Sequence, residues 1–192
     1  MCIRDRGGRH YKESPDGKPY VDQNFDTYAV EYTFPDGSKF FFDGRAMEGA
    51  AGIYSSYVQG TKGIAVAARS GDCDGPSAIY KGQNVASENV VWQSNDDSNP
   101  YQNEWNSLID AIRNDKPYSE VKRGVQASVV TSMGRMAAHT GQIIGYDDML
   151  NCPHEFAPGL DKLTSDTPAP LLPGPNGRYP VPQPGILTDR EY

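Results

Sequence analysis

The sequence predicts an α+β fold: an open, mainly antiparallel β-sheet with helices packed on one face, followed by an extended, proline-rich C-terminal arm. A β-hairpin pattern spans residues 26–45, and further short strand patterns come after it. The strongest helical patterns follow only after those strands. Strands that precede helices, rather than alternating with them, are typical of α+β proteins with antiparallel sheets.

The hairpin is the clearest local pattern. In residues 28–34, large apolar side chains alternate with smaller or polar ones, which is the period of a half-buried strand. Residues 35–38 (PDGS) have turn chemistry, because proline presets φ and glycine accepts a positive φ. Residues 39–43 (KFFFD) form the returning strand. Phe41 and Glu31 fall on the face opposite the main apolar row, so we expect another surface to dock there.

Before and after this hairpin the patterns are weaker. Residues 7–25 are polar and turn-rich, which indicates a loop. Residues 53–59 and 64–68 predict two strands around a tight turn at residues 60–63 (GTKG). A phosphate-binding loop needs a longer spacing and an adjoining helix, so a hairpin turn is the preferred interpretation. Two further candidate strands lie at residues 77–80 and 89–92, and the nearby DCD segment at 72–74 is interpreted as a solvated loop rather than a cation site.

The first helix is predicted to begin at Asn99. Asparagine is a good N-cap, Pro100 suits the first helical position, and Gln102 stands where a capping box has Glu or Gln. Residues 114–117 (NDKP) end the helix. Its apolar residues share one stripe at helical spacing: Trp105, Leu108, Ile109 and Ile112.

A second helix is predicted from residues 119–121 to Thr140, with Gly141 as its stop. We expect His139 to interact with the carbonyl groups at the helix end, in preference to a substrate. Residues 142–144 are a candidate strand and residues 146–150 a last helical turn. The apolar stripe, whose two methionines are interpreted as core rather than ligands, is Val125, Val129, Met133 and Met136, with the small residues Ser128, Ser132 and Ala137 beside it.

The composition changes after Asn151. Nine of the 15 prolines lie at or after Pro153, so this segment is expected to be extended and polyproline-II-like rather than helical or sheet-forming. An arm lying over the domain or over a neighbouring subunit is favoured over a disordered linker. The apolar anchors that favour the arm are Leu171, Leu172, Tyr179, Val181 and Ile186.

Charge and composition exclude several functions. The net charge of −7 disfavours binding to nucleic acid or to an anionic membrane surface. No apolar run approaches the roughly 20 residues of a membrane span. The three cysteines and three histidines are dispersed, so neither a disulfide framework nor a metal site is predicted.

The first six residues, MCIRDR, resemble translated sequencing-adaptor sequence and lack the apolar region of a signal peptide. We therefore expect the natural protein to extend upstream. The predicted organisation is an artefact at residues 1–6, one domain at residues 7–151 and a proline-rich tail at residues 152–192.

No nucleophile elbow, metalloprotease motif, dinucleotide fingerprint or kinase signature occurs in the sequence. Two carboxylate pairs, Asp96-Asp97 and Asp147-Asp148, are adjacent in sequence, and neighbouring side chains diverge on a strand or helix. They are therefore interpreted as a polar loop and an acidic first helical turn rather than as a glycosidase pair. The residues alone form no complete catalytic constellation.

Several short segments follow one another in a distinctive order: residues 7–9 (GGR), 32–37 (YTFPDG), 60–63 (GTKG), 99–104 (NPYQNE), 134–137 (GRMA), 140–141 (TG) and 146–151 (YDDMLN). In this order they resemble the C-terminal domain of the glucose–fructose oxidoreductase / inositol dehydrogenase (Gfo/Idh/MocA) family, over most of residues 7–151. The ending at residues 177–185 is also similar to that of some bacterial members.

The resemblance implies an NAD(P)-dependent oxidoreductase that acts on a sugar, polyol or related hydroxyl substrate. In that family an N-terminal Rossmann domain holds NAD or NADP, and a Lys-Pro element and an Asp and His pair follow it. None of these can be placed here, so we expect the cofactor domain and the catalytic residues upstream of Gly7. Some relatives carry a twin-arginine export signal, so the compartment stays open between cytoplasm and periplasm.

The segment present here is therefore expected to be the substrate-side and oligomerisation module. Alone it is expected to be inactive, to bind no cofactor or metal, and to form a homo-oligomer through the open sheet face.

Three residues are candidates for substrate contact: Arg9 and His10, near the expected junction with the catalytic segment, and Arg45, at the end of the hairpin. A surface or interface role is the competing interpretation for each. The competing function is a non-enzymatic, β-rich carbohydrate-binding or interaction module. A formed aromatic groove favours that alternative, and an exposed, unsatisfied interface favours the oxidoreductase module.

Overall fold

The computed structural model describes residues 12–13, 16–47, 49–52, 54–69, 76–95, 99–155 and 157–192. The chain forms two compact units, which are described separately: unit 1 comprises Met1–Glu48 and Glu120–Tyr192, and unit 2 comprises Gly49–Ser119. Several predicted features lie outside the described residues: the segment 1–6, Arg9, His10, the DCD segment at 72–74 and the pair Asp96-Asp97.

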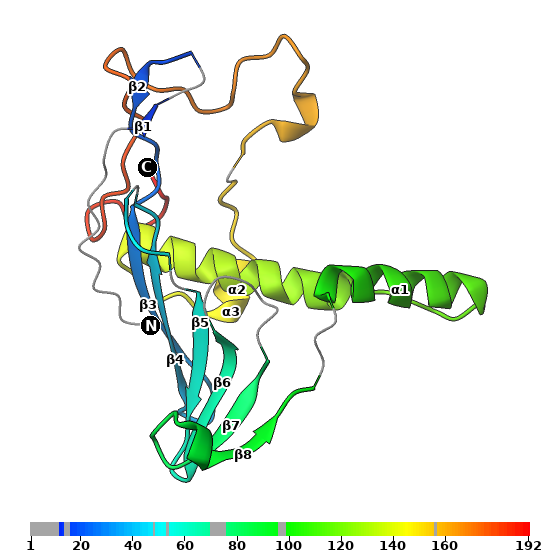
Figure 1. The fold of residues 1–192 in the computed structure, drawn as a ribbon. Helices are drawn as coiled ribbons and strands as arrows, with labels where there is room; N and C mark the ends of the chain where they lie inside the picture. Colours follow the sequence, from blue (N-terminus) through cyan, green and yellow to red (C-terminus); the bar gives the residue numbers. More distant parts are fainter. Residues whose placement is uncertain are drawn as a thin grey trace. The chain divides into compact units, whose positions relative to one another are not determined.

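The predicted α+β class, with antiparallel sheets and helices, is confirmed. The described residues form antiparallel sheets of two, two and four strands together with three α-helices (Figure 1). Unit 1 holds the small sheets and two of the helices, and unit 2 holds the four-stranded sheet and the remaining helix.

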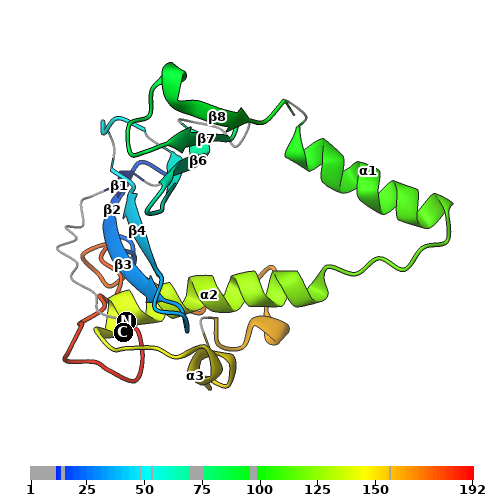
Figure 2. The ribbon, with the colours of Figure 1, turned by 90° about the horizontal axis from the view of Figure 1, so that it is seen from below.

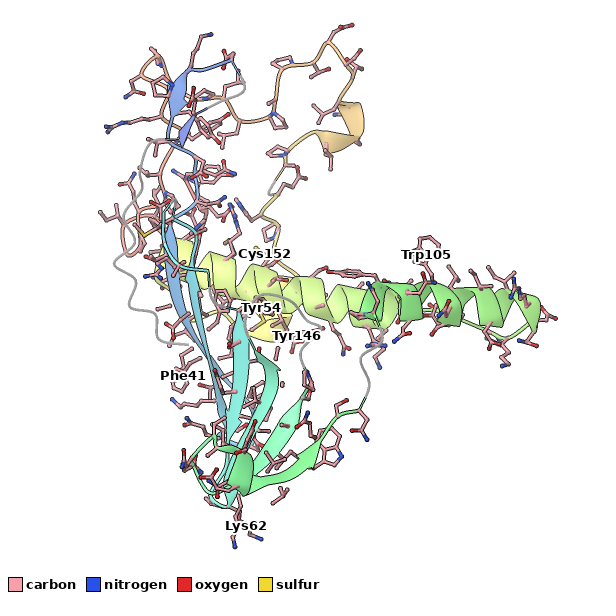
Figure 3. All side chains as sticks on the ribbon, in the orientation of Figure 1. Phe41, Tyr54, Lys62, Trp105, Tyr146 and Cys152 are labelled. Atoms are coloured by element: carbon pink, nitrogen blue, oxygen red, sulfur yellow. The ribbon has the colours of Figure 1, made fainter. Side chains whose placement is uncertain are left out.

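The predicted hairpin is present as β3 (Thr27–Thr33) and β4 (Lys39–Arg45). Its register pairs Val30 with Phe42 and Glu31 with Phe41, so the two faces are divided as the alternation predicts. Val30 is buried, whereas the side chain of Phe41 is 63% exposed on the opposite face (Figure 3). Gly37 takes the positive φ, 84°, that the tight turn requires.

Helix α2 (Val121–Thr140) packs against β3, and the hairpin lies along its C-terminal half (Figure 1). The Tyr32 hydroxyl donates to the Val130 carbonyl at 3.1 Å. Gly134 allows this approach, because a Cβ atom at that position would overlap the Tyr32 hydroxyl. Gly141 ends the helix in the left-handed conformation, with φ of 71°, as predicted.

The core of unit 1 forms where α3 (Tyr146–Leu150) packs against α2 (Figure 2). Its members come from the stripe predicted for α2 and from the segment that follows: Val129, Met136 and Met149, with Met133, Ile144 and Cys152 packed against them. The candidate strand at residues 142–144 is wrong. The Thr140 hydroxyl accepts from the Gln142 backbone N–H, which holds this segment in a turn.

The prediction of a loop at residues 7–25 is also incomplete. A short hairpin, β1 (Lys12–Glu13) and β2 (Pro19–Tyr20), pairs around a turn in which Gly17 has φ of 76°. The tail contains a 3-10 turn at Leu160–Lys162, and it then runs beside the residue that follows β2. The Val21 N–H donates to the Gly177 carbonyl, and the Tyr179 N–H donates back to the Val21 carbonyl.

In unit 2 the predicted strands pair consecutively as one sheet: β5 (Ser55–Gln59), β6 (Gly63–Arg69), β7 (Ala78–Lys81) and β8 (Val90–Gln93), with a 3-10 turn at Ser87–Asn89. The predicted turn at residues 60–63 closes β5 and β6, where the Gly60 N–H donates to the Gly63 carbonyl at 2.9 Å. Ile64 and Val66 are buried.

Helix α1 (Pro100–Arg113) begins as predicted, and the Asn99 side chain accepts from the N–H groups of Tyr101 and Gln102. The predicted capping box is wrong in one respect, because the Gln102 side chain reaches forward to donate to Asn106. The apolar stripe is largely exposed, because Trp105 is 62% exposed and Ile112 is 71% exposed. Figure 3 shows Trp105 on α1.

Candidate functional site

Side chains from three distant segments meet at the C-terminal end of α2. Tyr28 comes from β3, Arg135 and His139 come from α2, and Glu191 comes from the tail. The Tyr28 hydroxyl lies 2.8 Å from His139 Nε2, and His139 Nδ1 lies 2.7 Å from Glu191 Oε1. Arg135 donates to the same Glu191 oxygen and to the Asn24 side chain at 2.7 Å. We call these five residues the Glu191 cluster.

Local structure brings the cluster together. Arg135 and His139 are one helical turn apart, so both project from the same face of α2. Tyr28 lies on the hairpin face that also carries Val30, the face that packs on α2. The tail is held there because the Gly185 N–H donates to the Thr140 carbonyl at 2.8 Å, which satisfies a carbonyl at the helix end.

The prediction for His139 is therefore wrong. Its side chain is fully buried, and its two ring nitrogens contact Glu191 and Tyr28 rather than the terminal carbonyls of α2. Backbone N–H groups bind the carbonyls at the end of α2 instead. The Gly141 N–H donates to the Ala137 carbonyl, and the Gly185 N–H donates to the Thr140 carbonyl.

The partners of His139 place a proton on one of its ring nitrogens. A carboxylate only accepts hydrogen bonds, so the imidazole Nδ1–H donates to Glu191. The other ring nitrogen, Nε2, is hydrogen-bonded to the Tyr28 hydroxyl. The Tyr28 oxygen in turn accepts from the Phe25 N–H at 3.2 Å, and the Phe25 ring meets the imidazole edge-on at a centroid distance of 5.2 Å.

His139 and Arg135 favour the ionised form of Glu191. Burial acts to raise the pKa of Glu191, but the hydrogen bond from His139 and the charge and hydrogen bond of Arg135 together hold this pKa below its ordinary value. The carboxylate side chain is fully buried, whereas that of Arg135 is 29% exposed. His154 Nε2 lies 3.5 Å from the second oxygen of Glu191. Through Arg135 and His139 the buried carboxylate joins the tail to α2.

A groove adjoins the cluster within unit 1. Its volume is about 890 Å³, and it lies between the apolar face of the hairpin and α2. Tyr32 and Phe40 stack in its wall, with ring centroids 5.6 Å apart. Burial raises the pKa of the Tyr32 hydroxyl. The polar groups at its border include Asn24, Gln126 and Arg135.

This groove suits a largely apolar ligand with a polar end.

Among the described residues no three histidine, cysteine, aspartate or glutamate side chains gather as a metal site. In the same part of the chain, no helix has the length and apolarity that crossing a membrane requires.

Of the three predicted substrate-contact residues, the structure describes Arg45 alone, and it places Arg45 outside this site. Arg9 and His10 lie outside the described residues. Arg45 is exposed opposite Thr27, on the hairpin face that carries Phe41, so it faces away from the groove. Its contact with substrate stays a prediction.

Sequence reasoning missed Glu191 entirely, because a single acidic residue in a proline-rich tail has no periodic context. The available signal was on α2, where Arg135 and His139 share a face beside Ala138. Side chains that can carry positive charge on a small-residue, buried face indicate an acidic partner from elsewhere in the chain.

No protein-family model, curated protein or solved structure matches the chain.

We predict that Glu191→Gln lowers the free energy of unfolding by about 2–4 kcal/mol, because it leaves Arg135 without its buried counter-charge. The pKa of Glu191 is lower in the folded state than in the unfolded state. The ionised side chain therefore stabilises the fold at pH values above the unfolded pKa, and this stabilisation is lost as the pH falls through the folded pKa. The stability of the wild type should therefore decrease more than that of the variant as the pH falls below about 4.5, the ordinary pKa of a glutamate.

Urea unfolding at several pH values measures both effects. Asp189→Asn is the matched control, because the Asp189 side chain is 77% exposed and its ion pair with Arg190 is long, at 3.8 Å. It should change stability by less than about 0.5 kcal/mol. Equal stability losses in the two variants would contradict the assigned role of Glu191.

Proposed function

We propose that this chain supplies the substrate-side and self-association module of an NAD(P)-dependent oxidoreductase that acts on a sugar, polyol or related hydroxyl substrate. Within this proposal the cofactor and the catalytic residues belong to a segment outside the 192 residues of this sequence. The module positions the substrate and holds subunits together, and it carries out no hydride transfer by itself.

One observation carries the proposal. Residues of the family-like segments occupy positions where the fold needs a particular residue, namely helix ends and the close contact between β3 and α2. Gly134 permits the close approach of β3 to α2, and Arg135 beside it binds Glu191. Gly141 has the left-handed conformation that ends α2. Asn99 and Pro100 start α1. Segments that resemble one family and also occupy such positions support a shared architecture for the module.

The exposed apolar surfaces also support this proposal. In unit 1, Phe41 stands on the open hairpin face, and in unit 2, Trp105 and Ile112 share the stripe of α1; each of the three is more than half exposed. Large exposed apolar side chains of this kind are typical of surfaces that bind other protein surfaces.

A second candidate function, a free-standing carbohydrate-binding or interaction module, is favoured by one observation. The groove between the hairpin and α2 is already formed and has the aromatic residues Tyr28, Tyr32, Phe40 and Phe42 in its wall. Aromatic walls with a few polar groups at the rim are typical of ligand sites. The two functions differ in whether a dinucleotide-binding segment belongs to the same polypeptide.

Sequencing the source DNA upstream of the codon for Gly7 tests the function. We expect an open reading frame that encodes a strand, a glycine-rich turn and a helix, because a dinucleotide site needs close backbone approach and a helix N-terminus at the pyrophosphate. A Lys-Pro pair and an Asp and His pair should follow, to exchange the hydroxyl proton as hydride departs. A native start codon at Met1, with no coding frame before it, would overturn the proposal and favour the binding module.

We also propose that the module forms a homo-oligomer through the hairpin face that carries Phe41. Phe41→Lys should weaken association at least about tenfold, because a charge placed in the centre of an interface opposes its desolvation. Phe34→Lys, at the turn of the same hairpin and 51% exposed, is the matched control and should leave association unchanged. Sedimentation equilibrium measures both. A wild-type protein that is still monomeric at a concentration of tens of micromolar would contradict this part of the proposal. Even a weak oligomer, with a dissociation constant of about that size, is detectable there.

A further inference from the structure

An exposed apolar row crosses one face of the four-stranded sheet in unit 2. Residues directly opposite one another in an antiparallel sheet have their side chains on the same face. The pairing of the four strands places one residue of each strand in this row: Val58, Ala65, Ile79 and Trp92. The three large side chains of the row are all exposed. We call these four residues the sheet row.

A cavity of about 500 Å³ lies over the sheet row. Its wall also includes Val91, the extra residue of a bulge in β8, and a bulge re-aims the side chain that it carries. The volume is within the range of small-molecule sites, about 300–1,000 Å³. The strands of a sheet are about 4.8 Å apart, so the sheet row is about 14 Å long. An extended chain of about eight carbon atoms is shorter than this and fits along the row.

Two lysines line one end of the cavity. Lys81 comes two residues after the sheet row on β7, so its side chain is on the same face. Lys62 lies in the turn that closes β5 and β6, and Figure 3 shows it at the end of the sheet. The Gly82 N–H donates to the Lys62 carbonyl at 3.1 Å, which holds the backbones of the two lysine segments side by side. Gly63 permits this approach, because a Cβ atom there would overlap the Tyr80 carbonyl oxygen.

The charge of the cavity wall is opposite to that of the chain. The net charge of the chain is −7, yet the described lining residues include two lysines and no aspartate or glutamate. Neither lysine forms an ion pair with a carboxylate in the described part of the chain. Neighbouring like charges repel each other, and a carboxylate bound between the two ammonium groups would form charge-assisted hydrogen bonds with both.

Other occupants match this surface less well. A strongly hydrated anion such as phosphate would pair with the lysines but leave the sheet row in contact with water. A neutral apolar molecule would cover the row without pairing the lysines, and a cation would be repelled by them. A second copy stacked through the same face would bring no carboxylate to either lysine, because the described lining residues contain none. An apolar body with one negative charge matches both parts.

We propose that this face of unit 2 binds a small apolar carboxylate, such as a medium-chain fatty acid. The carboxylate lies between Lys62 and Lys81, and the acyl chain covers the sheet row and Val91. The cavity belongs wholly to unit 2, so it is separate from the groove between the hairpin and α2. The proposal needs no cofactor and no turnover, and it is tested independently of the oxidoreductase function.

Titration of the full chain with octanoate, octanol and octylammonium at neutral pH tests the proposal. Trp92 reports on the site, and Trp105→Phe leaves it as the single tryptophan of the chain. Octanoate should change the fluorescence of Trp92 saturably with a Kd of about 0.1–5 mM, as expected for a few buried methylene groups and one paired charge. The neutral and cationic probes carry the same acyl-length chain, and each should bind at least about tenfold more weakly.

Matched variants locate the carboxylate. The double variant Lys62→Gln/Lys81→Gln should weaken octanoate binding at least about tenfold, whereas Lys81→Arg keeps the charge and should stay within about threefold of the wild type. Lys116→Gln is the control, because it removes the same charge from an exposed lysine of unit 2 outside the cavity. It should bind octanoate like the wild type.

Circular dichroism melting checks that each variant is folded, and calorimetry on the chain with both tryptophans repeats the titration without the Trp105→Phe change. The proposal is overturned if octanoate shows no saturable binding up to about 50 mM, a concentration well above the expected Kd. It is also overturned if octanol or octylammonium binds as tightly as octanoate, or if the double lysine variant keeps wild-type affinity. A dimer that Ile79→Lys dissociates, seen by sedimentation equilibrium, would show instead that a second copy covers this face.

Discussion

The buried carboxylate of Glu191 is the interaction on which unit 1 depends. It accepts from Arg135 and from His139, and through His139 it is connected to Tyr28 on the hairpin. Removing such a charge from water costs several kcal/mol unless its partners are in place. The tail, the helix and the hairpin therefore have to assemble together, and a loosely attached tail would leave two polar groups of α2 buried and unsatisfied.

Two cavities of unit 1 border this cluster. Asn24 and Arg135 lie at one end of the groove between the hairpin and α2, and Tyr192 and Asn24 line a smaller cavity between the segment after β2 and the tail. A single set of hydrogen bonds thus shapes two cavities with different linings. The groove is lined mainly by apolar and aromatic side chains, whereas the smaller cavity combines tyrosines with a carboxylate and two amides.

Local sequence patterns were sufficient for most of the elements. Period-two alternation predicted β3 and β4 with the correct division of faces, Asn99 and Pro100 predicted the start of α1, and Gly141 predicted the end of α2. These features depend on residues within a few positions of one another. The two-residue strands β1 and β2 were missed because so short a segment shows no alternation.

The site was not predictable in the same way. His139 and Glu191 are separated by 52 positions, and Tyr28 and His139 by 111. No spacing rule connects residues at such distances, and the tail between them has no apolar period that would indicate which face it covers. The expectation for His139 considered only its own helix, so it overlooked a partner that arrives from the tail.

The most direct test of this account is the protonation pattern of His139, measured by long-range ¹⁵N–¹H correlation NMR at neutral pH. The account predicts a proton on Nδ1 with a slowly exchanging resonance, because Glu191 accepts from that nitrogen and the ring is fully buried. An Nδ1 without a proton, or a ring proton that exchanges as fast as that of an exposed histidine, would contradict the claim that Glu191 joins the tail to α2 and the hairpin.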